Sequence, residues 1–156
     1  MSGEIEARIE KLGLTLPPAA PAAANYMPFL IVGDLLFVSG QLSKAADGSV
    51  ITGQLGGDVA LETGQHAARL CALNILAQAK AALGSLDRIA QVMRLTAFVA
   101  ATPDFGGHPH VANGASDLLA EALGPKGRHT RSAVGVASLP MNAAVEIDAI
   151  IGISDR

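Results

Sequence analysis

Apolar residues occur along this chain in two patterns, short continuous runs and stripes that recur at every third or fourth position. The run over residues 29–42 is interrupted by Gly33-Asp34, a pair suited to a tight turn, so it predicts a β-hairpin. Its continuous apolar character indicates strands that are covered on both faces. Residues 92–100 predict a third strand, and residues 129–151 predict two more that are joined by a Leu-Pro turn.

The stripes predict three helices, of which the first covers residues 2–14. Its apolar side consists of Ile5, Ile9 and Leu12. Residues 16–24 follow as a linker of Pro and Ala, which is unsuited to a helix interior and favours an extended path. We therefore expect residues 1–24 to be an appendage to a single domain over residues 25–156.

The second helix is predicted from Asp58, whose side chain suits an N-cap, to Leu83, just before Gly84. One sector of this helix carries Ala68, Ala72, Ile75, Ala79 and Ala82, and another carries Leu70, Leu73 and Leu76. A sheet packs closely against the small residues, so the leucines need a different partner. This mismatch indicates a subunit interface.

A loop over residues 104–110 leads into the third helix, and a second loop over residues 124–130 precedes the last two strands. The domain therefore reads β-β-α-β-α-β-β. This order predicts an α+β fold, a two-layer sandwich with two helices on one face of a largely antiparallel sheet.

The composition of the chain disfavours nucleic-acid binding. The 156 residues suffice for one core, while an aromatic content of 3% and a net charge of −3 offer little to stack bases or to attract phosphates. Nucleic-acid binding is therefore disfavoured.

Cys71 is the single cysteine, so no internal disulfide forms, and a buried inert thiol is favoured over a reactive one. No signal-peptide pattern and no apolar run of membrane-spanning length occurs, so we expect a cytoplasmic protein without a membrane partner.

Three histidines are candidate metal ligands. Pro109 separates His108 from His110, and no fourth ligand is grouped with these two and His129. Surface or supporting positions are favoured for all three, and we expect neither a metal nor another cofactor.

A charge enters each of the last two predicted strands. Arg131 shares one strand face with Ala133 and Gly135, whose small side chains leave room beside the guanidinium. Glu146 shares a face of the final strand with Asp148. Buried charges are costly unless they are paired, so the two residues mark an exposed edge, a structural ion pair or a ligand site. The sequence does not fix the register that would decide among these readings.

Three segments together resemble the RidA/YjgF family, which is also labelled the endoribonuclease L-PSP family. They are VGDLLFVSGQL, RLTAFV and, near the end, RSAVGVASLPMNAAVEIDAI. The likeness spans roughly residues 25–153. The two outer motifs are specific in this order and spacing.

The resemblance implies a chorismate-mutase-like fold, assembled as a homotrimer with ligand clefts between adjacent subunits. It implies metal-free hydrolysis of reactive enamines and imines such as 2-aminoacrylate, which releases ammonia and a 2-keto acid, with a small carboxylate-bearing molecule as the ligand. Arg131 falls on the arginine that clamps the substrate carboxylate, and Glu146 on the carboxylate that positions or activates water. Tyr26, Ser39, Gly40, Asn113 and Ala133 fall on positions that line the cleft.

This chain departs from the family pattern at several of these positions. Ala133 stands where cysteine is frequent, and Tyr26 lies in Asn-Tyr-Met-Pro in place of Gly-Pro-Tyr-Ser. These departures, the Gly-Gly-His-Pro-His loop and the extra N-terminal helix indicate a divergent branch with its own ligand.

Three functions follow in order of preference. The first is an enamine/imine deaminase, which the carboxylate of Glu146 favours. The second is a non-enzymatic protein that senses a small carboxylate metabolite, which Ala133 favours. Ribonuclease activity comes third, supported only by the basic residues Lys126, Arg128 and Arg131.

Overall fold

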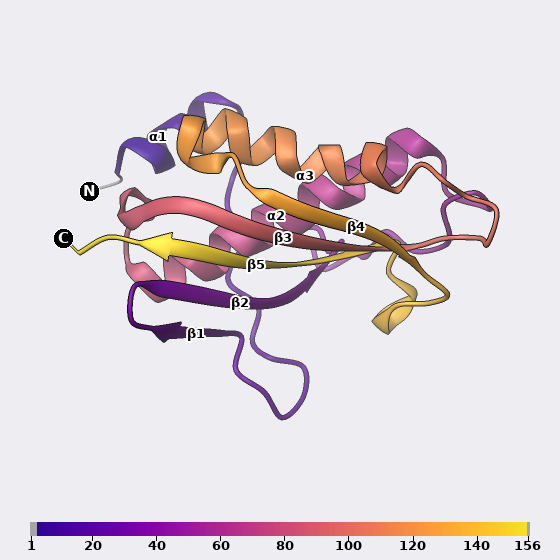
Figure 1. The fold of residues 1–156 in the computed structure, drawn as a ribbon, viewed down its shortest axis with the longest axis horizontal. Helices are drawn as coiled ribbons and strands as arrows, with labels where there is room; N and C mark the ends of the chain where they lie inside the picture. Colours follow the sequence, from indigo (N-terminus) through magenta and orange to yellow (C-terminus); the bar gives the residue numbers. More distant parts are fainter. Residues whose placement is uncertain (1–2, 156) are drawn as a thin grey trace.

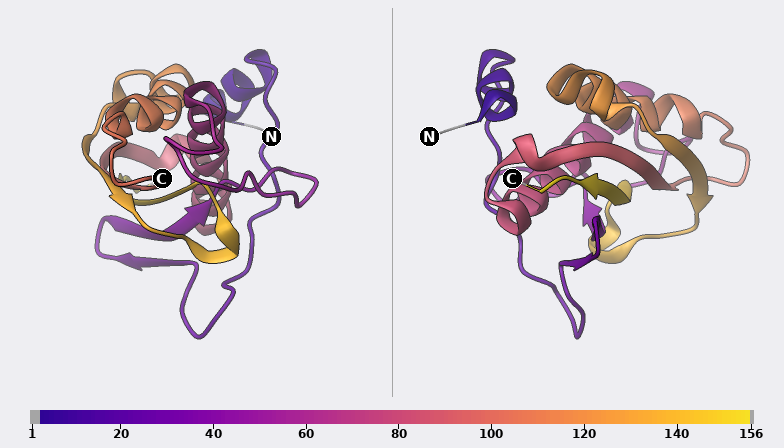
Figure 2. Two further views of the ribbon diagram at one scale, coloured as in Figure 1. Left: turned by 90° about the vertical axis from the view of Figure 1, so that its right-hand side faces the viewer. Right: turned by 60° about the vertical axis from the view of Figure 1, so that its left-hand side comes forward.

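Five strands form one sheet in the computed structural model, which describes residues 3–155 (Figure 1). The helices and strands are α1 (Glu4–Lys11), β1 (Phe29–Val32), β2 (Leu35–Leu42), α2 (Leu61–Leu83), β3 (Ile89–Ala100), α3 (His108–Leu123), β4 (Thr130–Val136) and β5 (Val145–Ile153). The α+β class and the single helix-covered sheet face are as predicted. Figure 2 shows α2 and α3 on one side of the sheet, with the other side free of helices.

The strand order is β1-β2-β5-β3-β4. All neighbouring strands are antiparallel except β3 and β4, which are parallel because α3 connects them as a crossover. The mixed, largely antiparallel sheet is therefore confirmed. No helix within residues 3–155 is long and apolar enough to cross a membrane.

The core lies between the sheet and the two long helices. Along β5, Val145, Ile147 and Ile151 are fully buried, and they alternate with less buried residues on the opposite face. The two helices approach closely at Gly114, where an added Cβ would lie 2.0 Å from the backbone oxygen of Gln65. The small residues of this helix pair thus serve close packing.

The leucine argument for a subunit interface is wrong. Leu73 and Leu76 are buried within the protomer, and Leu70 packs against the same core. The expectation that the strands of residues 29–42 are covered on both faces is also wrong for a single chain, because α2 and α3 cover only one face. Exposed apolar side chains lie instead on β1, β2 and β4, at Leu30, Ile31, Val32, Phe37 and Val134.

The N-terminal helix is shorter than predicted and docks on the domain. Ile5 and Ile9 join the hydrophobic core, and the Asp87 carboxylate accepts hydrogen bonds from the backbone N–H groups of Glu4 and Ile5, each at 2.9 Å. These contacts fix α1 in place. The division into residues 1–24 and 25–156 stays a prediction, and residues 1 and 2 lie outside the described part of the chain.

Two helix boundaries differ from the predicted ones. Asp58 does not cap α2, which begins at Leu61, because its carboxylate accepts a hydrogen bond from the Gln54 backbone N–H at 2.8 Å within the preceding loop. The end of the predicted loop over residues 104–110 is helical, since α3 begins at His108. Pro109 is compatible with this first turn because its missing N–H would have no partner there.

Candidate functional site

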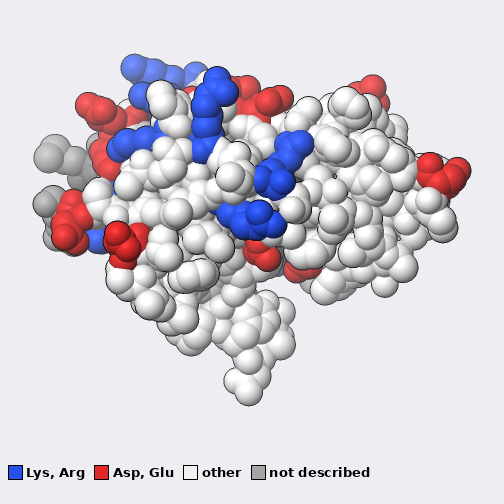
Figure 3. Space-filling model, in the orientation of Figure 1, with Lys and Arg blue, Asp and Glu red and all other residues white. Residues whose placement is uncertain are grey.

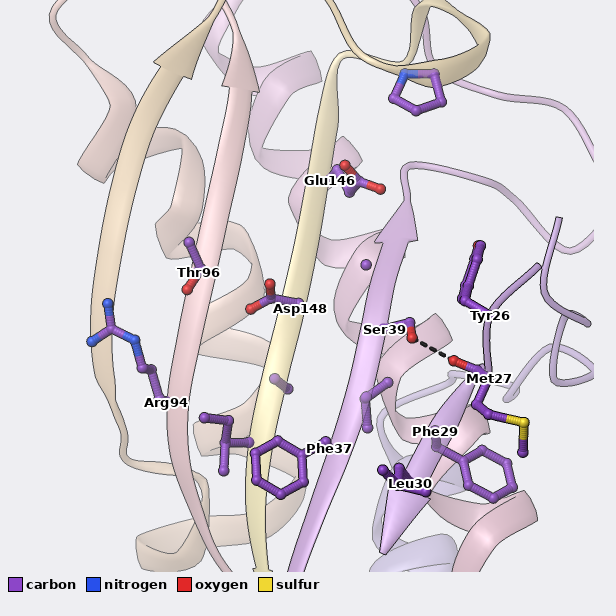
Figure 4. Close-up of a pocket in the computed structure, with 15 residues that line it drawn as sticks. Tyr26, Met27, Phe29, Leu30, Phe37, Ser39, Arg94, Thr96, Glu146 and Asp148 are labelled. Atoms are coloured by element: carbon purple, nitrogen blue, oxygen red, sulfur yellow. Dashed lines mark hydrogen bonds between the residues drawn. The ribbon is translucent and has the colours of Figure 1, made fainter. Parts of the chain in front are cut away.

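A β-bulge in β2 shapes the candidate site. Val38 pairs with Ala149 and Gln41 pairs with Ile147, so Ser39 and Gly40 together oppose a single residue of β5. The Ser39 hydroxyl donates to the Met27 carbonyl oxygen at 2.6 Å (Figure 4). This bond ties the bulge to the segment that carries Tyr26.

Gly40 lies directly against the carboxylate of Glu146. A Cβ at position 40 would lie 2.7 Å from Glu146 Oε1 and 2.9 Å from its Cδ. A side chain at position 40 would therefore displace the Glu146 carboxylate from its present position. Gly40 of the β-bulge and the Glu146 carboxylate thus lie side by side.

The Glu146 carboxyl has an environment that disfavours its charge. Its pKa is raised, first by partial burial and then by the negative charge of Asp148 on the same strand face. Within residues 3–155 no hydrogen bond or ion pair engages this carboxylate. A carboxyl of raised pKa without a protein partner is suited to exchange protons with a ligand or with water.

Glu146 lines an open groove of about 910 Å³ on the sheet face away from α2 and α3. Figure 4 shows the polar side chains Arg94, Thr96, Asp148 and Glu146 along one side and the aromatic rings of Tyr26 and Phe29 along the other, with the Phe37 ring below Asp148. Of these, sequence reasoning had singled out only Tyr26 and Glu146 as ligand-binding residues. We call this cavity the groove.

Arg131 lies elsewhere, on the helix-covered side of the sheet edge. Its Nη1 donates to Asn113 Oδ1 at 2.9 Å and to Ser116 Oγ at 3.0 Å, and its Nη2 donates to the Pro109 carbonyl oxygen at 3.2 Å. All three acceptors are neutral, and no carboxylate within residues 3–155 forms an ion pair with this arginine. The guanidinium is held in position with its charge uncompensated.

His129 supports this arrangement. Its Nδ1 donates to the Gly127 carbonyl oxygen at 2.6 Å, so its Nε2 is left to accept from the Ser116 hydroxyl at 2.8 Å. Burial and the nearby positive charge of Arg131 lower the pKa of His129, although the bond to Gly127 opposes the shift. The imidazole is therefore neutral near pH 7. We name Arg131, Asn113, Ser116 and His129 the arginine cluster.

The groove and the arginine cluster do not meet within one chain. β3 separates β4 from β5, and Arg131 pairs with Leu95 of β3 while Glu146 pairs with Phe98. The Arg131 side chain contacts α3, whereas the Glu146 side chain faces the groove on the opposite side. An ion pair between Arg131 and Glu146 within the chain, one of the sequence readings, is therefore wrong.

The cysteine and histidine candidates outside the arginine cluster take structural positions. Cys71 is fully buried, and its pKa is raised first by burial and then by the charge of Glu146, so its thiol is unsuited to act as a nucleophile. The His108 ring packs edge-on against Phe105 at 5.2 Å. In the described part of the chain, no three His, Cys, Asp or Glu side chains form a group that could hold a metal ion.

Basic residues gather near the arginine cluster. Lys126 and Arg128 are exposed at the loop before β4, and Arg131 is half-buried beside them. Figure 3 shows Lys and Arg side chains in the centre and at the upper left of one face, with Asp and Glu side chains mainly toward its edges. The patch is small, and it offers no aromatic residue of its own for stacking bases.

The family follows from a match over nearly the whole chain. A family model described as "YjgF/chorismate mutase-like, putative endoribonuclease" matches residues 6–150. The chain belongs to the YjgF/RidA family. Its sheet and helices are accordingly the chorismate-mutase-like fold that the resemblance predicted.

Relatives within the YjgF/RidA family match this chain over nearly their full length. Protein TCP17 of Trypanosoma cruzi is 48% identical over 99% of this chain and 97% of its own. The crystal structure of Atu1372, a protein of unknown function from Agrobacterium tumefaciens, has a TM-score of 0.89 at 54% identity, covering 96% of this chain and 94% of that one. The crystal structure of a "putative endoribonuclease" from Shewanella oneidensis has a TM-score of 0.93 at 38% identity, covering 97% of this chain and 100% of that one.

Proposed function

We propose that the protein hydrolyses small 2-imino and 2-enamino acids, such as 2-aminoacrylate, to 2-keto acids and ammonia. In this proposal, Arg131 of one subunit and Glu146 of the adjacent subunit face each other across a cleft of a homotrimer. Tyr26, Ser39 and Gly40 line the Glu146 side of the cleft, and Asn113 and Ala133 line the Arg131 side.

The separation of two unpaired charges is the observation that carries the proposal. Arg131 is oriented by three neutral acceptors, and Glu146 has no hydrogen-bond or ion-pair partner among residues 3–155, yet the two side chains occupy opposite faces of one sheet. Exposed apolar side chains on β1, β2 and β4 supply surface for a second copy to cover. A solved relative supports the ligand class. The TM-score with E. coli TdcF "with bound serine" is 0.64 at 26% identity, covering 89% of this chain and 94% of that one.

The chemistry uses only these residues and water. Arg131 binds the substrate carboxylate with its guanidinium. The protonated Glu146 carboxyl gives its proton to the methylene carbon of the enamine, which yields the imine. The resulting carboxylate takes a proton from water as the water oxygen bonds to the imine carbon and the C=N electron pair moves to nitrogen. Glu146 then gives this proton to the amino nitrogen. The C–N bond breaks as the hydroxyl proton passes back to Glu146, which releases ammonia and the keto acid and restores the protonated carboxyl.

The test is an assay with 2-aminoacrylate that is generated by a second enzyme, in the presence of EDTA. Pyruvate formation faster than the spontaneous rate supports the proposal. A spontaneous rate combined with tight binding of a small carboxylate would favour the sensing function, which the absence of a thiol at Ala133 supports. Cleavage of RNA without any effect on 2-aminoacrylate would contradict both functions.

The environment of Glu146 predicts a pH effect. The basic limb of kcat/KM with 2-aminoacrylate should follow the pKa of this carboxyl, because activity falls as the protonated form that gives its proton to the enamine is lost. Asp148→Asn removes the negative neighbour that raises the pKa of Glu146, so the limb should move to lower pH. Rates measured across pH 4 to 9 give the comparison. A limb that stays in place or moves to higher pH in the variant would contradict the assignment.

A further inference from the structure

A second cavity opens beside the groove, between the linker that follows α1, strand β2 and helix α2. We propose that this cavity, the side pocket, receives an aliphatic substrate side chain, so that the preferred substrate is the imine of an amino acid with a branched or longer aliphatic side chain. The inference rests on the proposed function and names its substrate class. Residues that line the side pocket include Ala20, Ala22, Tyr26, Gly40, Leu42 and Met141.

The side pocket adjoins the reacting carboxyl. Tyr26 and Gly40 line both the groove and the side pocket. Gly40 is also the residue against which the Glu146 carboxylate lies, since a Cβ there would come within 2.7 Å of Oε1. A substrate whose imine carbon faces Glu146 therefore has its side chain next to the opening of the side pocket. Figure 4 shows Tyr26 at this end of the groove, beyond Ser39 from Asp148.

The linker forms the outer wall, and hydrogen bonds hold it in place. The Gln78 amide donates to the Ala20 carbonyl oxygen at 2.6 Å, which attaches the linker to α2. The Ala23 backbone N–H donates to the Tyr26 hydroxyl at 3.4 Å, which attaches the linker to the residue shared with the groove. Its side chains in this wall are Ala and Pro. The N-terminal segment thus closes a pocket with small apolar groups.

Size and polarity indicate an aliphatic occupant. The side pocket has a volume of about 110 Å³. About 10 to 15 Å³ of such volume is enough to hold one water-sized group, so the side pocket has room for a branched side chain of about four carbon atoms. The Asn74 amide nitrogen is engaged by the Leu42 and Lys44 carbonyl oxygens at 3.2 and 2.9 Å, and that of Gln41 by the Ser39 carbonyl oxygen at 3.0 Å. Both N–H groups of the Asn74 amide are therefore engaged, and these two amides leave only one N–H group, on Gln41, for a polar side chain. Lys44 is the cation at this pocket, and it is exposed.

Substrates of different size test the proposal. The imines of alanine, leucine and glutamate are generated in the assay by an amino-acid oxidase, and keto-acid formation above the spontaneous rate gives kcat/KM for each. One buried methylene favours binding by about fourfold, so the leucine imine should exceed the alanine imine by about tenfold or more. A glutamate imine that is turned over best would instead assign the pocket to an acidic side chain that reaches Lys44, and would overturn the proposal.

A variant that fills the side pocket tests the proposal, and the same substitution outside the pocket is its matched control. Ala22, like Ala20, is a half-buried linker residue in the wall, whereas Ala24 is exposed and outside it. Ala22→Phe should lower kcat/KM for the leucine imine about tenfold and leave the alanine imine within about twofold, while Ala24→Phe should change neither. Equal loss for both imines, or no loss for either, would contradict the proposal.

Failure of this inference is distinguishable from failure of the proposed function. Turnover of the alanine imine without preference for the leucine imine would remove only the side-pocket assignment. If no imine is hydrolysed faster than spontaneously, the same comparison is made by calorimetry with pyruvate and 4-methyl-2-oxopentanoate. Tighter binding of the larger keto acid, abolished by Ala22→Phe, would still support the side pocket, and equal binding would overturn it.

Discussion

Glu146→Gln should lower kcat by about 10² to 10⁴-fold, the usual contribution of a general acid–base group. The substitution keeps the shape of the side chain beside Gly40 but removes its exchangeable proton. Binding of a carboxylate ligand should stay within a few-fold of normal, since Arg131 provides that contact. Single-turnover rates and calorimetry on the same preparation separate the two quantities.

The same variant should be at least as stable as the natural protein at pH 7. The pKa of Glu146 is raised in the folded state, so the folded protein binds more protons than the unfolded chain between the ordinary carboxyl pKa and the raised one. Stability is therefore lost as pH rises through that interval, and Gln removes this loss. Glu10→Gln, at an exposed position on α1, is the control and should change neither activity nor melting temperature by much. Full activity in Glu146→Gln would exclude the proton-transfer role.

Arg131→Lys should weaken carboxylate binding almost as much as Arg131→Ala does. The guanidinium uses Nη1 for Asn113 and Ser116 and Nη2 for Pro109, a planar arrangement that an ammonium group does not reproduce. A charge-assisted hydrogen bond contributes about 1.5 to 3 kcal/mol, so the loss should be on the order of tenfold to a few hundredfold. Calorimetric titration with a stable 2-keto acid gives the ratio directly.

Arg128→Lys serves as the matched control, because Arg128 is exposed and close in sequence but outside the arginine cluster. It should bind the keto acid normally. Thermal melting checks that the Arg131 variants remain folded, because each variant removes the guanidinium that donates to three acceptors. Normal binding in folded Arg131→Ala would return this residue to a structural role.

The fold was predictable because its determinants are local. Apolar runs, the Gly33-Asp34 turn and the order of elements lead to one helix-covered sheet, and the structure has it. The packing of Leu70, Leu73 and Leu76 inside the protomer was not predictable in the same way. Whether a helix sector is covered depends on the position of α3, and the close approach at Gly114 appears only in three dimensions.

The site was predictable in part. Ser39, Gly40 and Glu146 do come together, although their roles remain predictions, and the family motifs pointed to them. Arg94, Asp148 and Ser116 were missed as ligand-binding or supporting residues because their relevance depends on register. Asp148 opposes the bulge, and Ser116 reaches Arg131 only because α3 crosses above β4. Spacing along the chain carries no signal for such contacts.

The most direct test of a shared cleft mixes two inactive variants. Arg131→Ala and Glu146→Gln chains are unfolded together in equal amounts, refolded and assayed, with light scattering to establish the trimer and mass spectrometry to establish mixing. If each site combines Arg131 of one subunit with Glu146 of the next, every mixed trimer contains one intact site, and about a quarter of the natural activity should return. If mixed trimers form and no activity returns, or if the protein is a stable monomer, the shared cleft is contradicted.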